Sequence, residues 1–283
     1  MPTQTVAARQ PFGDLLRHWR SVRVKSQLAL ASDARTTPRY VSFVETGRAQ
    51  PSRQMVVRLA RALDVPLRER NDLLLAAGFA PLYSDASLQS PSLAWIGRAL
   101  DAMLTQHEPF PAVVMDRAWN LQRANHGAEE LFGRMFAPKP IPAAANVLRL
   151  IIEPGAVRRH ITNWDAVVPA LLDRARREAV GGVFDRATAD LVAALRDRPD
   201  VAELVSRDDV TPAAAPVVDL HFDVAGTELR FFSVVSTIGT PIDVTAQELR
   251  LEAFFPSDDQ TRDAWAELTS RDRPQPDGRR VPT

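Results

Sequence analysis

Closely spaced helix start and stop signals in residues 26–53 restrict this part of the chain to short helices. Ser26 is a residue type that caps helix N-termini, and the Thr-Pro pair at 37–38 places proline at a first helical position. Gly47 is typical of the position just past a helix end, and Ser52 again begins a helix. This spacing predicts a helix, a tight turn and a second helix, which is the layout of a helix-turn-helix unit.

Apolar residues continue at helical spacing on both sides of this stretch. A helix is predicted from Phe12 to about Val22, and two more are predicted after Ser52 and after Pro66. The sequence therefore predicts a compact all-α domain of five helices at 12–82. A flexible N-terminus at 1–11 precedes this domain. A linker at 83–91 follows it, which is the YSDASLQSP part of the run APLYSDASLQSP.

Charge is distributed unevenly along a chain whose formal net charge is zero. Residues 1–83 hold thirteen Lys or Arg against six Asp or Glu, whereas the remaining residues hold twenty-two against twenty-nine. A basic N-terminal domain is suited to a polyanion such as double-stranded DNA. The alternative is that Arg and Ser only decorate a solvated helical bundle, but caps in register and the charge asymmetry together favour DNA.

The candidate DNA-binding residues divide into two groups. Side chains near helix N-termini are expected to position the domain on phosphates, and these are Gln27, Arg48, Ser52 and Arg53. Side chains on the second helix of the unit are expected to reach base edges, and these are Thr37, Arg39, Tyr40 and Ser42. One such domain makes few phosphate contacts, so we expect a homodimer that reads two half-sites about one helical turn apart.

The second half of the chain has a mixed pattern. A hairpin is predicted at 112–122, and helices are predicted at 92–107, 125–136, 164–180 and 186–197. Three later segments alternate or run apolar, namely Val217–Val224, Glu228–Val235 and Leu249–Phe255, with a turn at 225–227 between the first two. The prediction is a multidomain chain with an α+β domain at 92–270, built on an antiparallel sheet, and a flexible tail at 271–283.

A sheet covered by helices is a common setting for a small-molecule pocket. The apolar candidates for its lining are Met115, Trp119, Leu121, Phe132, Phe136, Phe222 and Phe232, and plain core packing is the favoured interpretation for any single one. Arg149 lies in the otherwise apolar run NVLRLII and needs a partner. That partner is either a structural carboxylate or the head group of an acidic ligand. The run RREA at 176–179 is typical of a solvated helix face.

The chain lacks the residues and motifs that several classes of function require. The chain has no cysteine, and its five histidines have no metal-ligand spacing, so neither a metal nor another cofactor is expected. No nucleophile-elbow, Walker or dinucleotide motif occurs, which argues against an enzyme. No apolar run is long enough for a membrane span and no hydrophobic signal core is present, so we expect a cytoplasmic protein.

The runs SQLALASDA, YVSFVETGRAQPSR and LRERNDLLLAAGFAP resemble the Xre/Cro-type helix-turn-helix of bacterial regulators, and more narrowly the MmyB-like transcription regulators. VVMDRAWNLQRANHGAEELFG resembles the opening of the PAS-like domain of that family. The resemblance implies a PAS-like ligand domain suited to elongated apolar molecules such as fatty acids. The chain departs from the family at Arg35-Thr36, where glycine is common, and at 208–210, where Asp-Asp-Val replaces His-Asp-Val.

These observations predict a transcription regulator whose PAS-like domain senses a small apolar or acidic ligand, with a fatty acid as one candidate. Two alternatives remain for the second domain. It could recruit a protein partner, or it could be an enzyme without a recognisable motif.

Overall fold

The computed structural model describes residues 10–142, 144–181, 186–206 and 217–270. The predicted flexible ends, 1–11 and 271–283, therefore lie outside the described residues except for 10 and 11, and so does the departure at 208–210. The chain forms two compact units. Of the described residues, the first unit holds 10–94, 178–181, 186 and Ile238–Glu248, and the second holds 95–142, 144–177, 187–206, 217–237 and 249–270.

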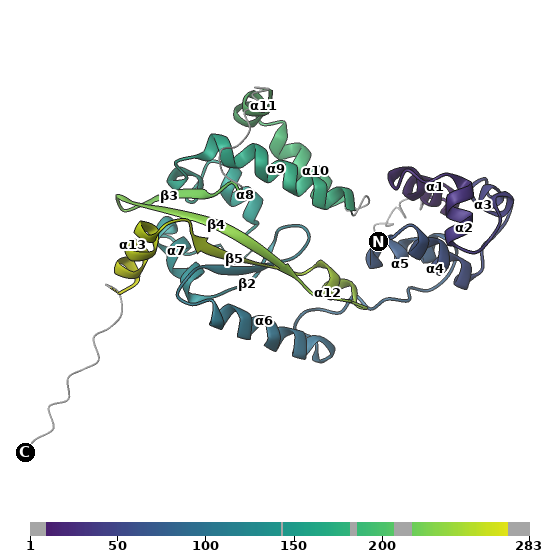
Figure 1. Ribbon diagram of the computed structural model, residues 1–283, viewed down its shortest axis with the longest axis horizontal. Coiled ribbons are helices and arrows are strands. Elements are labelled where there is room, and N and C mark those ends of the chain that lie inside the picture. The colour runs from purple at the N-terminus through teal and green to yellow at the C-terminus, as the bar shows by residue number, and fades with distance from the viewer. Residues whose placement is uncertain (1–9, 143, 182–185, 207–216, 271–283) are drawn as a thin grey trace, which may run out of the picture. The chain divides into compact units, whose positions relative to one another are not determined.

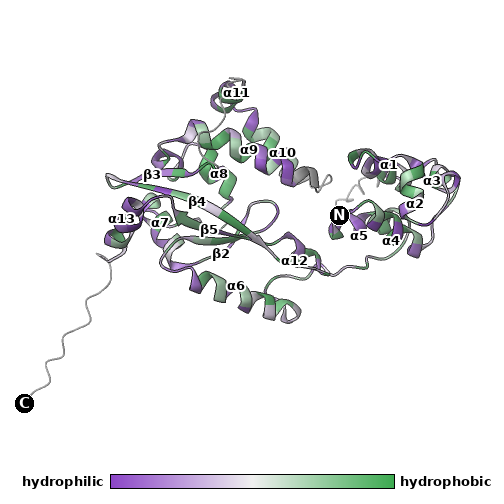
Figure 2. Ribbon diagram, viewed as in Figure 1, coloured by the Kyte–Doolittle hydropathy of each residue, from purple (hydrophilic) through white to green (hydrophobic). Residues whose placement is uncertain are grey.

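Five short helices make up most of the first unit, as predicted. They are α1 (Phe12–Val22), α2 (Gln27–Asp33), α3 (Pro38–Glu45), α4 (Arg53–Ala62) and α5 (Leu67–Ala76). Hydrophilic and hydrophobic residues alternate along them (Figure 2), as amphipathic helices require. Their apolar faces meet in one core, in which Leu16, Trp19, Leu30 and Leu59 are almost fully buried.

The predicted N-caps are made by the residues expected to make them. Ser26 accepts a hydrogen bond from the backbone N–H of Ala29 at 3.0 Å, and Thr37 accepts one from Tyr40 at 3.2 Å. Ser52 likewise caps α4. Each cap satisfies a backbone donor that has no partner within its helix, so these short helices begin at defined residues.

A segment from far along the chain completes the first unit. The short helix α12 (Val244–Glu248) packs beside α5, with Val244 fully buried. The side-chain oxygen of Gln247 accepts the backbone N–H of Leu67 at 2.7 Å, at the N-terminus of α5. Pro66, the N-cap residue of α5, makes no side-chain cap. Gln247 therefore supplies the acceptor that the local sequence lacks.

A five-stranded antiparallel sheet organises the second unit, which confirms the predicted α+β fold. The strands are β1 (Ala112–Met115), β2 (Leu121–Ala124), β3 (Leu220–Val224), β4 (Thr227–Thr237) and β5 (Arg250–Pro256). Their order across the sheet is β2-β1-β5-β4-β3. The two hairpins of the sheet are thus joined through β5 at its centre.

Helices cover both faces of the sheet (Figure 1). They are α6 (Ala94–Gln106), α7 (His126–Phe136), α8 (Val147–Ile152), α9 (Trp164–Gly181), α10 (Arg186–Arg196), α11 (Pro199–Ser206) and α13 (Asp259–Ser270), with 3-10 turns at Pro91–Leu93 and Arg158–His160. Helix α6 lies on one side, and α8, α9 and α10 lie on the other. The predicted helix at 92–107 begins two residues late, because Ser92 lies in a 3-10 turn and caps no helix.

In the first hairpin, the second strand begins later in the sequence than predicted. The second strand was expected to begin at Trp119, but β2 begins at Leu121. Trp119 has φ of +66°, a left-handed conformation that no strand residue adopts. The carboxylate of Asp116 holds this turn by accepting the backbone N–H groups of Ala118 and Asn120, both at 2.9 Å.

The second hairpin has the turn that the sequence predicts. Ala225 and Gly226 both have positive φ, +55° and +81°, and Val224 pairs with Thr227. A two-residue turn with positive φ at both positions matches the right-handed twist of the strands that it joins. No described helix is both long and apolar enough to cross a bilayer.

Candidate functional site

A buried carboxylate organises the helix-turn-helix. Glu45, at the end of α3, is only 3% exposed. It accepts hydrogen bonds from Arg20 Nε at 2.6 Å and Arg20 Nη2 at 3.0 Å, and from Gln27 Nε2 at 2.8 Å. The hydrogen bond with Glu45 raises the pKa of Arg20 above its ordinary value. Because Arg20 lies on α1 and Gln27 on α2, one carboxylate sets the positions of three helices.

The turn between α2 and α3 has the left-handed conformation usual for this motif, although it lacks glycine. Arg35 has φ of +51°, and Thr36 donates its N–H to the carbonyl of Ala31 at 2.8 Å. An arginine in this conformation costs about 1 kcal/mol relative to glycine. The departure seen in the sequence therefore leaves the shape of the turn unchanged, so α3 follows α2 in the usual way.

The predicted DNA-binding residues differ in exposure. Five side chains are exposed, and these are Thr37, Arg39, Arg48, Ser52 and Arg53. Tyr40 is half-buried against the core and Ser42 is half-buried. The side-chain amide of Gln27 donates one of its two N–H groups to Glu45, so that donor is already used within the protein. Arg39 extends over the ring of Phe43, with 5.2 Å between its Cζ and the ring centre.

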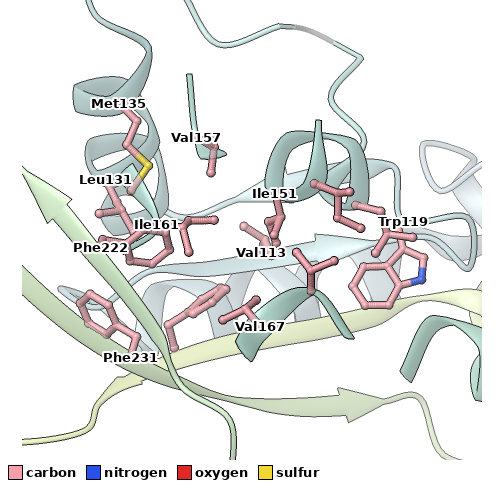
Figure 3. Packing of buried hydrophobic residues seen from close by; sticks show 14 of the residues in the cluster. Val113, Trp119, Leu131, Met135, Ile151, Val157, Ile161, Val167, Phe222 and Phe231 are labelled. Atoms are coloured by element: carbon pink, nitrogen blue, oxygen red, sulfur yellow. The ribbon is translucent and has the colours of Figure 1, made fainter. Parts of the chain in front are cut away.

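An apolar cavity of about 720 Å³ lies in the second unit. Its walls come from β1 and β2, from the sheet strands β3 to β5, and from helices α7, α8 and α9. Figure 3 shows the buried cluster around it, with Trp119 at one end and Phe222 and Phe231 at the other. The volume falls in the range of small-molecule sites, which is roughly 300–1,000 Å³.

The structure brings four of the eight predicted ligand residues to this cavity. Trp119, Leu121, Phe132 and Phe222 belong to its lining. Met115 is fully buried in the core, Phe136 packs against that core from the outside, and the ring of Phe232 stacks on Phe255 with centres 5.5 Å apart. None of these three is among the lining residues.

Of the two possible partners of Arg149, a structural carboxylate or the head group of an acidic ligand, the structure shows the carboxylate. Its Nη1 lies 2.6 Å from Glu153 Oε1, one helical turn away, and its side chain is 53% exposed. It does not belong to the cavity lining. The apolar run around it forms α8, and Arg149 lies on the outward side of that helix, where a charge remains solvated.

Two arginines that sequence reasoning missed lie at the cavity instead. Arg174 donates to both oxygens of Glu252, at 2.9 Å and 3.2 Å, and Glu252 also accepts the hydroxyl of Ser233 at 2.5 Å. Arg177 follows Arg174 at i+3 on α9 and also lines the cavity. The side chain of Arg177 is exposed, as expected for the run at 176–179.

Positive charge accumulates around Trp119. The guanidinium groups of Arg174 and Arg250 both lie over its ring, at 4.8 Å and 5.2 Å from the ring centre. Burial, and next the neighbouring charge of Arg174, lower the pKa of Arg250 to about 10. Two arginines against the single buried carboxylate of Glu252 make the surroundings of Trp119 favourable to an anion.

The described residues contain no group of three His, Asp or Glu side chains placed to hold a metal ion. The signal for the arginines was present in the sequence. Val167, Leu171 and Arg174 follow one face of α9, but the pairing with Glu252, seventy-eight residues later, has no local signature.

A helix-turn-helix joined to a domain with a largely apolar cavity defines a DNA-binding regulator with a ligand-binding domain. The comparisons agree with this class. Residues 11–73 match the helix-turn-helix domain family, and residues 96–268 match the family described as the MmyB-like transcription regulator ligand binding domain. That match covers more than half of the chain, so this protein belongs to the MmyB-like transcription regulators. A comparison with curated proteins finds no match.

Proposed function

We propose that this protein is a transcription regulator whose affinity for its operator depends on an acidic, elongated apolar ligand such as a fatty acid. The observation that carries the ligand class is the apolar cavity with arginines at one end. A regulator of this kind acts in the cytoplasm of a bacterial cell, on double-stranded DNA, and it has no catalytic role.

The N-terminus of α3 is the proposed reader. Arg39 is exposed in the first turn of α3, the part of a recognition helix that contacts base edges. Ser52 and Arg53 begin α4, where the N-terminus of the helix favours a phosphate. As a homodimer, the protein would place two α3 helices in successive turns of the major groove.

Substitutions at Arg39 and Arg53 should have different effects on DNA binding. Arg39→Ala is expected to relax base preference at one position by about 1–3 kcal/mol. Arg53→Ala is expected to weaken binding to all sequences alike and to reduce the slope of log affinity against log salt by about 1. Fluorescence anisotropy with operator and scrambled DNA at several salt concentrations measures both. Equal binding by both variants and the parent would rule out this face as the reader.

The ligand's acid group is placed at Arg177 rather than at Arg149. Arg174 is already paired with Glu252, whereas Arg177 makes no ion pair within the part of the chain that the structure describes. The apolar walls from Phe132 and Phe222 suit an acyl chain. We therefore propose that the acid group binds Arg177 and that the chain fills the interior.

Arg177→Gln should weaken binding of dodecanoate by about 10-fold, because a charge-assisted hydrogen bond is lost. Binding of dodecanol, which has no charge, should change by less than about 2-fold. Arg149→Gln is the matched control, since Arg149 is an exposed arginine of the same domain outside the cavity. Isothermal titration calorimetry with the full chain measures each affinity. A larger loss in the control than in Arg177→Gln would place the head group elsewhere.

The identity of the ligand can be tested directly. Mass spectrometry of denatured protein purified from cells should detect a released lipid acid. A cavity without ligand, together with a co-purified protein, would favour a protein-interaction module instead. Hydrolysis or transfer of an acyl or nucleotide substrate by the chain would favour an enzyme.

A further inference from the structure

The carboxylate of Glu252 is the only buried acidic group among the described residues of the cavity lining. Its side chain is 7% exposed. An ionised carboxylate accepts about four hydrogen bonds and donates none. Arg174 supplies two donors and Ser233 supplies one. One acceptor position of Glu252 therefore receives no hydrogen bond from the described residues.

Ser233 adds further acceptor capacity beside it. The hydroxyl proton of Ser233 points to Glu252, at 2.5 Å between the two oxygens. The Ser233 oxygen keeps its lone pairs, and no described residue donates to them. Because both residues line the cavity, the polar patch that they form presents acceptors alone. We call Glu252 and Ser233 the acceptor patch.

An acceptor patch in a mostly apolar cavity selects for a donor. A ligand that covers Glu252 and Ser233 with methylene groups removes water from their open positions and leaves them unpaired, which is costly. A ligand with a hydroxyl or amide N–H at this point satisfies them. We propose that the cavity takes an elongated apolar acid that carries a hydrogen-bond donor near its acid group, with a 3-hydroxy acid as the simplest example.

The separation of the two polar contacts follows from α9. Arg177 and Arg174 are three residues apart on one helix, so their Cβ atoms lie about 5–6 Å apart. Arg174 holds Glu252 directly. An acid group at Arg177 therefore places the acceptor patch within the first few carbon atoms of the ligand. This inference rests on the proposed function, because it takes the acid group to bind at Arg177.

The test compares three kinds of ligand on the full chain after removal of lipid. They are dodecanoate, each enantiomer of 3-hydroxydodecanoate, and 3-methoxydodecanoate, which has the oxygen but no donor. One enantiomer of the hydroxy acid is expected to bind about 10-fold more tightly than dodecanoate, and the methoxy acid no more tightly. Equal binding of hydroxy acid and dodecanoate would overturn the donor inference and leave the acid-binding proposal standing. Binding of none of the three would overturn both.

Glu252→Gln provides a second readout, since the amide keeps the size of the carboxylate and brings two N–H donors. The preference for the hydroxy acid over dodecanoate is expected to fall to about 2-fold or less. Thermal unfolding shows whether the variant folds, and the ligand series on the parent protein decides the inference if it does not. An unchanged 10-fold preference in a folded variant would exclude Glu252 as the acceptor.

Discussion

Arg20→Ala is expected to lower the free energy of unfolding of the helix-turn-helix by about 3 kcal/mol or more. Arg20 makes two of the hydrogen bonds to the buried carboxylate of Glu45, and Gln27 makes one. Removal of the arginine leaves a buried negative charge with the neutral amide of Gln27 as its main partner. The cost comes from that unpaired charge rather than from the small apolar surface that the substitution exposes.

Urea unfolding followed by circular dichroism measures this effect on the full chain. Arg17→Ala is the matched control, because Arg17 is on the same helix but is 49% exposed, with its Nε 3.9 Å from the Glu45 carboxylate and its Nη2 donating to the Glu45 backbone carbonyl at 3.0 Å. It should cost about 1 kcal/mol or less, as an exposed pair does. DNA affinity should fall in parallel with stability for Arg20→Ala, because Glu45 ends α3, the proposed reading helix. A variant as stable as the parent would show that Glu45 does not organise the three helices.

Arg174→Met is expected to lower the unfolding free energy of the ligand-binding unit by a similar amount, about 3 kcal/mol. The methionine keeps contact with the ring of Trp119, so the change isolates the charge. Glu252 would then remain buried with Ser233 as its one donor. A second change, Glu252→Leu, should recover most of the stability, since apolar replacement of both partners is often neutral.

Differential scanning calorimetry of the single and double variants measures this coupling. Arg149→Met serves as the control, because the Arg149–Glu153 pair is exposed and its loss should cost about 0.5 kcal/mol or less. If the double variant were less stable than Arg174→Met, the buried Arg174–Glu252 pair would be a net stabilising contact. The proposal that this pair is a fixed part of the ligand site would then need other evidence.

Local signals predicted local structure well. Ser26, Thr37 and Ser52 cap the helices that they were expected to cap, and the turn at 225–226 joins the strands expected on each side. Each of these features depends on residues within four positions of one another. The chain does not need to be folded for such preferences to act.

Non-local pairs could not be predicted in the same way. Glu45 is one of many charges on the helices of the sequence, yet it is buried beneath Arg20 from another helix. Arg149 has apolar neighbours along the chain, but the helix turns its side chain to solvent. Arg174 could not be singled out from its sequence neighbours, because its partner Glu252 comes from a strand much later in the chain.

By itself, the sequence determined the helix-turn-helix, the five strands and the family resemblance, because caps, turns and periodicity act over short distances, but it did not predict the helices α8, α11, α12 and α13. The tertiary structure alone decided which charges are buried, that α12 completes the helical unit, and that Arg174, Arg177, Ser233 and Glu252 line the cavity. The physical reason is that burial and ion pairing depend on which distant segments of the chain meet. The residues adjacent in the sequence do not determine this.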